Sequence, residues 1–489
     1  MANALTRGVS PQTRHVLAAA SALALLAGAL LIHVPEALTM GLVVALIAFW
    51  AFVVVLSRPF VGLIGLTVCL TYAPNIPLLS TESLGGAAWT VKAGAFRIGG
   101  DDLFIASTFL GWLAYKLHQR GEIRLGPGRM VILVIAIWAV LLASALSATY
   151  IFGTTHGIVS ALWACKWLEY ALLSLIAYDT LSTPGQAKVL WNVFFCASAL
   201  TATLAVILFF LRLNEIGLSG ATLENMRVSL GTWNPNAFAL LFLISIVLAF
   251  AQFGDKSNPF LARAWLWIGT ALLLVGLFGT FSRTALFALP VGLAVVATHQ
   301  GWRGMGRLLL AFSILVGVAG SIVWALFANA AYLVRRLEEL ELFFWYGIIP
   351  ENLLYRTLPW EGLLEYFFDY PLIGIGFNVA VPDNVYLQLL VETGIMGASL
   401  MLYFWVIVIF FRIFKIAKAT DDPWLRRLAQ GYVGVMASMF VAGLVGNSFL
   451  VPRITGILLL LWGGITKAHA LREGRIRAGS AAGEDWRTG

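Results

Sequence analysis

The sequence predicts an all-α, polytopic integral membrane protein with about 12–14 transmembrane helices. Of its 489 residues, 60% are apolar and only 11% are charged, whereas ordinary soluble domains carry about 25% charged residues. Apolar runs of about 17 to 25 residues, the length that crosses a bilayer core, recur along the whole chain. These runs lie at 16–34, 37–57, 60–79, 102–118, 129–149, 157–180, 187–211, 235–253, 262–281, 284–299, 305–328, 384–415, 425–447 and 452–470.

The basic residues predict how the chain is oriented. Lysine and arginine collect in cytoplasmic loops, and most of the 32 basic residues fall on one side if the N-terminus lies inside. The cluster from Lys467 to Arg487 belongs to that side, so we expect both termini in the cytoplasm. The net charge of +8 follows from this topology and implies no nucleic-acid partner. The first apolar run lacks a small-residue cleavage site, which predicts an anchor and not a removed signal peptide.

Cysteine usage and motif content narrow the possible chemistry. Cys69, Cys165 and Cys196 all fall inside predicted spans, which predicts small apolar fillers without a disulfide or a metal cluster. No glycine-rich nucleotide-binding loop follows a predicted strand, and the distribution of apolar and polar residues predicts no soluble catalytic domain. We therefore expect the activity to reside in the membrane-embedded part of the chain.

Loop lengths and composition divide the chain into three parts. Residues 1–211 are predicted to form the N-terminal transmembrane helices, and residues 212–470 a second membrane domain. That domain contains the longest outward loop, 329–383, which includes an amphipathic helical pattern in AYLVRRLEELELFFWYGIIP. The polar segment 471–489 predicts a disordered cytoplasmic tail.

A group of basic residues breaks the orientation rule and faces outward. Arginine dominates this group, and its planar fork matches phosphate oxygens. Arg283 interrupts the apolar stretch FGTFSRTALFALP, where a charge requires a water-filled cavity or a partner. The group predicts a phosphorylated ligand, with pairing to nearby acids or lipid headgroups as the alternative for each member. Its members are Lys92, Arg97, Arg212, Arg227, Arg283, Arg335, Arg336, Arg356 and Arg453.

Other polar residues within or beside the spans allow two interpretations each. Lys166 and Glu169 are three residues apart in one span, which predicts a neutralised pair on one helical face, with a catalytic pair as the alternative. In GTWNPNAFALLF, Asn234 and Asn236 flank a proline at the start of a span. They are predicted to cap that span or to bind sugar hydroxyls.

The run DYPLIGIGFNVAVPDNVYLQLLVETGIMG, residues 369–397, is the most informative stretch. It joins a polar loop to a long apolar helix, so Asp383, Asn384 and Glu392 are placed where a span enters water. A membrane enzyme would place its chemistry at such a position. The glycines of this run are predicted to permit turns and close helix packing.

Taken in order, several fragments resemble the O-antigen polymerase and ligase superfamily, often called the Wzy and WaaL type. They are GTWNPNAFA, FSRTALFALPVG, RTLPWEGLLEYFFDYPLIGIGFN, DNVYLQLLVETGIMG and VGNSFLVPRITGILLLLWGG, within roughly residues 225–465. The resemblance implies a membrane-embedded glycosyltransferase of GT-C-like architecture in the bacterial inner membrane. It implies an undecaprenyl-diphosphate-linked oligosaccharide as donor on the periplasmic face, without metal or cofactor. Membrane lipid and a chain-length regulator or export machinery are the other implied partners.

The resemblance also assigns roles to residues. Four arginines would hold the donor diphosphate: Arg283, Arg335, Arg336 and Arg356. Asp383 stands where ligases typically carry a histidine, and an acidic residue there is similar to many exopolysaccharide polymerases. Asp383 is the first candidate for the catalytic base, with a helix N-cap as its alternative role, and Glu392 is the second candidate. The candidates for sugar binding are Asn234, Asn236, Asn384 and Tyr386.

Three functions remain open from the sequence. A polymerase would transfer the saccharide onto a sugar hydroxyl of another lipid-linked repeat unit, for O-antigen or exopolysaccharide. A ligase would transfer the glycan to lipid A core or to a protein, and a transporter would flip the lipid-linked saccharide. The polar residues gather at the predicted outer side, which favours an enzyme over a transporter with charges on several mid-membrane spans. A purely structural protein would leave the outward arginines without a ligand.

Overall fold

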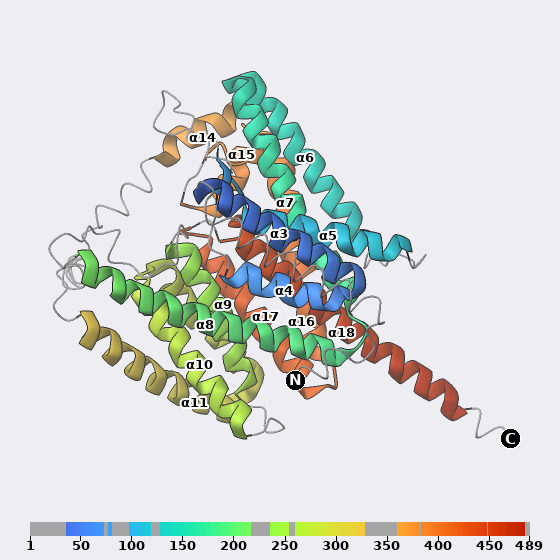
Figure 1. Ribbon diagram of the computed structural model, residues 1–489, viewed down its shortest axis with the longest axis vertical. Helices are drawn as coiled ribbons and strands as arrows, with labels where there is room; N and C mark the ends of the chain where they lie inside the picture. The colour runs from blue at the N-terminus through green and yellow to red at the C-terminus, as the bar shows by residue number, and fades with distance from the viewer. Residues whose placement is uncertain are drawn as a thin grey trace.

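The computed structural model describes residues 36–72, 77–80, 97–118, 128–216, 235–253, 260–327, 359–380, 383–446 and 448–484. Within these residues the protein is helical apart from one pair of short strands (Figure 1). The predicted span 16–34 and the predicted amphipathic helix of the outward loop lie outside the described residues.

The N-terminal half contains six described helices and the two strands. Strands β1 (Pro77–Ser80) and β2 (Arg97–Gly99) pair antiparallel. The predicted span 60–79 is therefore too long, because α4 ends at Tyr72 and β1 occupies the end of the range. Pro74 disfavours helical backbone in the residue before it. The helices are α3 (Glu36–Ser57), α4 (Pro59–Tyr72), α5 (Gly100–His118), α6 (Gly128–Phe152), α7 (Thr154–Thr180) and α8 (Pro184–Ile216).

The C-terminal half contains the remaining described helices. A π-helical stretch, Tyr403–Phe410, joins α15 to α16 without a break in the helix. The α-helices are α9 (Pro235–Gln252), α10 (Phe260–Gly279), α11 (Arg283–Phe327), α14 (Pro359–Asp369), α15 (Val385–Leu402), α16 (Phe411–Ala419), α17 (Pro423–Ala442) and α18 (Pro452–Glu484).

The membrane character predicted from composition is confirmed by the helices. Six helical segments in the described part are long and apolar enough to cross a bilayer. They are Met130–Phe152, Thr154–Thr180, Pro184–Phe209, Pro235–Gln252, Val385–Ala419 and Pro452–Gly474. Three shorter apolar helices accompany them, at Ala48–Ser57, Pro59–Thr71 and Ala264–Gly279.

Proline sets the start of many of these helices. Its fixed φ suits the first helical position, where the missing amide hydrogen has no intrahelical partner in any case. The Asp422 carboxylate caps α17 by accepting a hydrogen bond from the Leu425 amide at 2.7 Å. The helices that begin at proline are α4, α8, α9, α14, α17 and α18.

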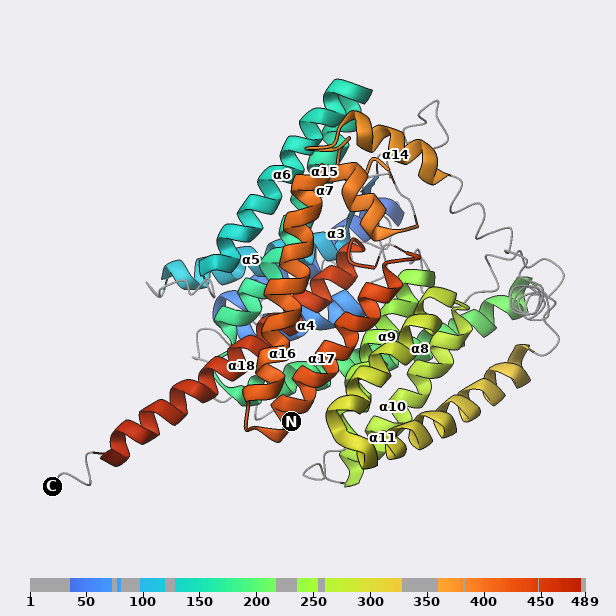
Figure 2. The same ribbon diagram turned by 180° about the vertical axis from the view of Figure 1, so that it is seen from behind.

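Two helices run further than the sequence predicts. Helix α11 replaces the two spans 284–299 and 305–328 by one helix of 45 residues, which Figures 1 and 2 show bent into two arms. The predicted connection contains no proline to stop the helix. Helix α18 continues to Glu484 and so includes most of the predicted disordered tail 471–489. Extending an existing helix costs far less than nucleating one.

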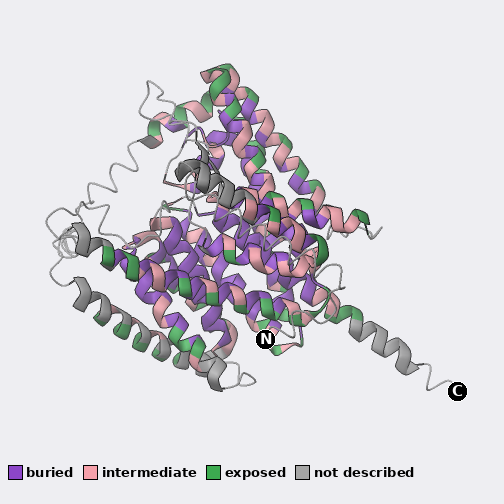
Figure 3. Ribbon diagram, in the orientation of Figure 1, coloured by how far each residue is buried: buried purple, intermediate pink, exposed green. Residues whose placement is uncertain are grey.

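The core is formed around α9, which the other helices enclose. All its residues from Ala237 to Gln252 are buried, and α8, α10, α11, α17 and α18 pack against it. Figure 3 shows this buried centre. Gly292 of α11 and Gly434 of α17 bring their helices into backbone contact, because a Cβ on Gly434 would lie 2.7 Å from the Gly292 carbonyl oxygen. Small residues serve the same purpose in other membrane helix pairs.

Helix α15 is broken at Gly394, and the preceding loop repairs the break. Gly394 has φ 62° and ψ −171°, so the helical hydrogen bonds across it are lost. The amides of Ile375 and Gly376 donate to the carbonyls of Val391 and Glu392 at 3.1 and 3.0 Å. In return, the amides of Ile395 and Met396 donate to the carbonyls of Pro371 and Leu372 at 2.8 and 3.2 Å. Two carbonyls before the break and two amides after it therefore have partners, which a nonpolar medium requires of backbone groups.

Gly394→Ala is expected to destabilise the protein. A Cβ at this position would lie 2.3 Å from the Leu372 carbonyl carbon, and a positive φ costs a non-glycine residue about 1–2 kcal/mol before any clash. Thermal unfolding in detergent should show a clearly lower midpoint. The matched control is Gly317→Ala, since no atom lies within 4 Å of the new Cβ. Equal midpoints for the two variants would contradict this account of the break.

A buried ionic network joins the N-terminal helices to α18. The Arg453 side chain bonds Asp101 at 2.6 Å, and the Tyr170 hydroxyl donates to the same Asp101 oxygen at 3.0 Å. The Lys166 amine bonds Asp102 at 2.8 Å. The sequence predicted Glu169 as the partner of Lys166. The structure adds Asp102, which is 64 residues distant and which helical spacing does not predict.

Arg453→Met should destabilise the protein strongly, because it leaves the buried Asp101 carboxylate without its cation. Breaking a buried pair by removing one partner costs about 3–5 kcal/mol. Thermal unfolding should show a large fall in midpoint, with partial recovery in the Asp101→Asn/Arg453→Met double variant. The control is Arg426→Met, since Arg426 meets Asp421 at 3.8 Å on the surface and such pairs contribute little. A single-variant midpoint close to that of the control would overturn the assignment.

Candidate functional site

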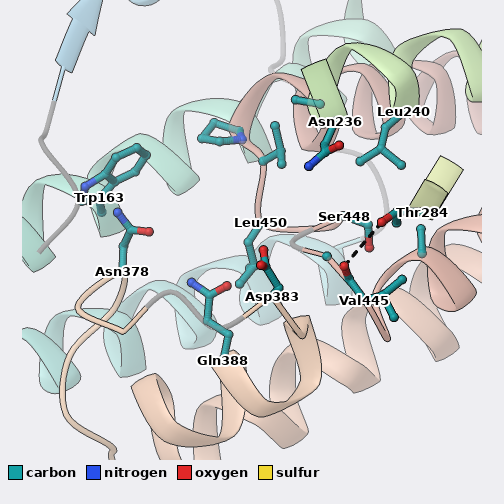
Figure 4. Close-up of a pocket in the computed structure, with 15 residues that line it drawn as sticks. Trp163, Asn236, Leu240, Thr284, Asn378, Asp383, Gln388, Val445, Ser448 and Leu450 are labelled. Atoms are coloured by element: carbon teal, nitrogen blue, oxygen red, sulfur yellow. Dashed lines mark hydrogen bonds between the residues drawn. The ribbon is translucent and has the colours of Figure 1, made fainter. Parts of the chain in front are cut away.

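A polar pocket opens where several helices begin. Its cavity volume is about 240 Å³, and Figure 4 shows the side chains on its wall. The lining residues come from α7, from the starts of α9, α11, α15 and α18, and from the loops before α15 and α18. They are Trp163, Asn236, Ala237, Leu240, Thr284, Asn378, Asp383, Gln388, Ala442, Val445, Gly446, Ser448, Leu450, Val451 and Pro452.

Four helix N-termini meet at this pocket. Asn236 lies in the first turn of α9, Thr284 in that of α11 and Pro452 begins α18, while Asp383 directly precedes the capping residue of α15. The N-terminal end of a helix carries a partial positive charge and exposed amide donors, which favour a bound anion. All four ends are those that the orientation rule predicts to face outward. The arrangement is suited to a negatively charged group.

The structure separates the two roles that the sequence left open for Asp383. The N-cap of α15 is the next residue, Asn384, whose side-chain oxygen accepts hydrogen bonds from the amides of Tyr386 and Leu387, both at 3.0 Å. Asp383 is half-buried on the pocket wall. Capping therefore does not account for Asp383, and its carboxylate lies where a ligand would bind.

Arg283 directly precedes a residue of the pocket wall. It is the first residue of α11 and is half-buried, and the next residue, Thr284, lines the cavity. The Thr284 hydroxyl donates to the Val445 carbonyl at 3.4 Å, which ties α11 to the loop before α18 (Figure 4). Phe281 in the preceding turn has φ 49°, a strained value for a bulky residue. Such strain is concentrated at functional sites.

Glu392 lies behind the pocket wall and holds one of its loops. Its fully buried carboxylate accepts hydrogen bonds from the Ala380 amide at 3.0 Å and the Gln388 side-chain amide at 3.1 Å. Its second oxygen, Oε2, has no hydrogen-bond partner among the described residues. Asn378 has φ 60°, a left-handed turn conformation that is uncommon outside glycine. Glu392 thus fixes the loop that carries Asn378.

The other predicted residues are only partly brought together. Asn236 joins Asp383 on the pocket wall. Asn384 serves as the helix cap, and the Tyr386 hydroxyl donates to the Phe440 carbonyl of α17 at 2.7 Å. Arg453, one of the outward arginines, is instead buried against Asp101. The predicted residues that lie outside the described residues are Asn234, Arg335, Arg336 and Arg356.

Several wall residues had no signal in the sequence. Trp163 comes from the segment 1–211, so the pocket draws on both predicted membrane domains. Gln388 and Ser448 lie within the fragments DNVYLQLLVETGIMG and VGNSFLVPRITGILLLLWGG, but neither was identified as a candidate site residue. Only Asn378 follows a recognisable turn, the GIGFN sequence. Among the described residues, no three His, Cys, Asp or Glu side chains are grouped to hold a metal ion.

The fold and the pocket define a multi-pass membrane protein with a polar cavity at the ends of its helices. Residues 268–402, from α10 to the end of α15, match a protein-family model described as O-antigen ligase. The predicted resemblance to the O-antigen polymerase and ligase superfamily is confirmed for this segment, which contains Arg283, Asp383 and Glu392. A comparison of the sequence with curated proteins gave no match. The family match supports a role in glycan assembly of the ligase or polymerase kind.

Glu392→Gln is expected to cost about 1–3 kcal/mol of stability, because the new side-chain NH₂ cannot accept the buried hydrogen bonds that reach Glu392. Asp383→Asn changes a half-buried wall residue in the same way and should change stability little. Thermal unfolding of the two variants in detergent makes the comparison. A larger loss for Asp383→Asn would show that Glu392 does not hold the loop.

Proposed function

We propose that the protein is a bacterial inner-membrane polysaccharide polymerase. It transfers an undecaprenyl-diphosphate-linked saccharide onto a sugar hydroxyl of another lipid-linked repeat unit at the periplasmic face, without a metal ion. The observation that carries this proposal is the position of Asp383 on a pocket where four helix N-termini meet, within the segment that matches the O-antigen ligase family.

The reaction needs a proton acceptor and a site for a leaving diphosphate. The acceptor hydroxyl oxygen forms a bond to C1 of the donor sugar, and its proton passes to the Asp383 carboxylate. The bond between C1 and the diphosphate oxygen breaks, and the lipid diphosphate leaves with that electron pair. A positioned carboxylate contributes about 10²–10⁴-fold to such a step. A single in-line displacement inverts the configuration at C1.

The growing negative charge on the diphosphate is stabilised by fixed dipoles and by arginine. Residues of the first turns of α9, α11 and α18 line the pocket, and Arg283 adds a full positive charge next to the wall residue Thr284. Charges and dipoles arranged before the reaction are an effective means of stabilising a transition state. Arg335, Arg336 and Arg356 belong to the same proposed diphosphate site. Asn236 is placed to bind sugar hydroxyls, as are Asn234, Asn384 and Tyr386 in the sequence-based proposal.

A ligase and a transporter are the alternatives. A ligase would use the same pocket with another acceptor, lipid A core or a protein, and Asp383 in place of the ligase histidine favours the polymerase. A transporter is expected to carry charges on several mid-membrane helices, and α5, α7 and α18 do carry them. These charges are paired with each other between helices, Arg453 with Asp101 and Lys166 with Asp102, as in a static cross-link. That pairing supports the enzyme.

The test is the incubation of purified protein with lipid-diphosphate-linked repeat units and gel analysis of the products. Wild type should give a ladder, and Asp383→Asn and Arg283→Ala should each lower the rate by about 10²–10⁴-fold. Matched controls are Asp421→Asn and Arg426→Ala, the same substitutions in a surface ion pair away from the pocket. Both controls should polymerise at the wild-type rate.

Other outcomes separate the alternatives. If wild type gives no ladder but transfers the saccharide once a second acceptor is supplied, the protein is a ligase. If wild type transfers nothing under either condition but moves the lipid-linked saccharide across vesicles, it is a transporter. A ladder that both pocket variants make at the wild-type rate would remove Asp383 and Arg283 from the mechanism.

A further inference from the structure

We propose that Gln388 accepts a hydrogen bond from one hydroxyl of the acceptor saccharide, and that this contact selects the acceptor. The proposal rests on the proposed transferase function and adds a specificity residue to it. Its basis is a small annex behind the main pocket and a buried amide oxygen that has no hydrogen-bond partner among the described residues.

The annex lies between α7, α15 and the start of α18. It shares Trp163, Asn378, Gln388, Leu450 and Pro452 with the main pocket, so the two cavities adjoin. Its volume of about 20 Å³ is enough for one water-sized group. The aromatic side chains that complete its wall are Trp167, Tyr170 and Phe377. A single small polar group between aromatic rings fits this space.

The hydrogen bonds behind the wall fix the orientation of the Gln388 amide. Glu392 Oε1 accepts a hydrogen bond from the Ala380 backbone amide, and the Gln388 side-chain nitrogen donates to the same oxygen at 3.1 Å. The carbonyl oxygen Oε1 is then directed away from Glu392. In the described part of the chain Oε1 has no hydrogen-bond partner, although Gln388 is only 1% exposed. A buried polar atom of this kind is costly unless a ligand or water bonds it.

The missing partner must be a hydrogen-bond donor. An ionised diphosphate oxygen accepts hydrogen bonds and cannot donate one, so the diphosphate cannot be the partner of Gln388 Oε1. A sugar hydroxyl donates and also accepts, and the Trp167 indole N–H, which makes no hydrogen bond among the described residues, lines the same annex as a donor. A hydroxyl is small enough for the annex, whereas an acetamido group would bring a carbonyl and a methyl group as well. The chemistry of the annex therefore matches one hydroxyl.

The position of Gln388 assigns that hydroxyl to the acceptor. Gln388 and Asp383 line the same cavity, and Figure 4 shows both side chains on the part of its wall that leads into α15. In the proposed reaction the acceptor hydroxyl gives its proton to Asp383. The sugar held there extends a second hydroxyl into the annex. An acceptor without that second hydroxyl leaves Oε1 unpaired and is rejected, since loss of one hydrogen bond to a buried group is costly.

The experiment measures transfer of saccharide from the lipid-linked donor to short acceptor glycans. These glycans lack a diphosphate, so they can act only as acceptors in the transfer reaction. A set of acceptors, each lacking one hydroxyl, is compared with the parent by kcat/KM. Wild type should discriminate against one deoxy acceptor by about 10–100-fold. Gln388→Met, which keeps the side-chain length and removes the acceptor, should bring that ratio close to one. Trp167→Phe, which removes only the N–H, should reduce the same ratio in part.

The matched control is Gln252→Met. Gln252 is also a buried glutamine whose Oε1 has no hydrogen bond among the described residues, but it lies at the far end of α9 and lines neither cavity. This control should keep the full discrimination.

Three results would overturn the inference. One is equal rates for all deoxy acceptors with wild type, which would mean that the annex holds only solvent. The second is a lower rate for every acceptor with an unchanged ratio in Gln388→Met, which would make Gln388 a structural residue. The third, should Gln388→Met fail to fold, is an unchanged ratio in Trp167→Phe. If wild type transfers to no acceptor at all, the proposed function fails, and that outcome is distinct from these three.

Discussion

The exchange of backbone hydrogen bonds at Gly394 is the constraint on which the pocket depends. A nonpolar surrounding offers no water to replace lost helical bonds, so a break in α15 is possible only because residues 371–376 supply partners on both sides of it. That requirement fixes the path of the loop before α15. The same loop then carries Asn378 to the pocket wall, and Glu392 holds its amides from behind.

Electrostatic pairing performs a related task on the other side of the pocket. Helix α18 begins at Pro452, whose neighbour Arg453 is bonded to Asp101 of α5. Tyr170 of α7 shares that carboxylate and also lines the annex. The start of α18 is thereby held between α5 and α7. The N-terminal helices are consequently part of the site's framework, although the family match lies wholly within residues 268–402.

The roles of the two carboxylates follow from their surroundings. Asp383 and Glu392 lie on the same segment, and the sequence offered both as catalytic candidates. In the structure Glu392 is fully buried and bonded to the Ala380 amide and the Gln388 side chain, while Asp383 is half-buried on a cavity wall beside the ends of four helices. A carboxylate that must satisfy buried amides is committed to the fold. A carboxylate on a polar wall is available to a substrate, which supports Asp383 as the proposed base.

The sequence by itself determined the class of protein and most of its helices. Long apolar runs have few alternatives to a helix in a membrane, and proline positions mark where many helices begin. Residue patterns also identified the segment that matches the O-antigen ligase family. Sequence patterns were less reliable where no local signal exists. The connection expected at 300–304 within α11 and the extension of α18 beyond residue 470 contain no proline that would end a helix.

Only the tertiary structure decided which distant residues meet. Lys166 bonds Asp102 at a separation of 64 residues, and Arg453 bonds Asp101 at a separation of 352 residues. The pocket likewise combines Trp163 of α7 with residues that begin four other helices. Helical periodicity describes which residues share one face of one helix, but it carries no information about which helices pack together. The site exists only through that packing.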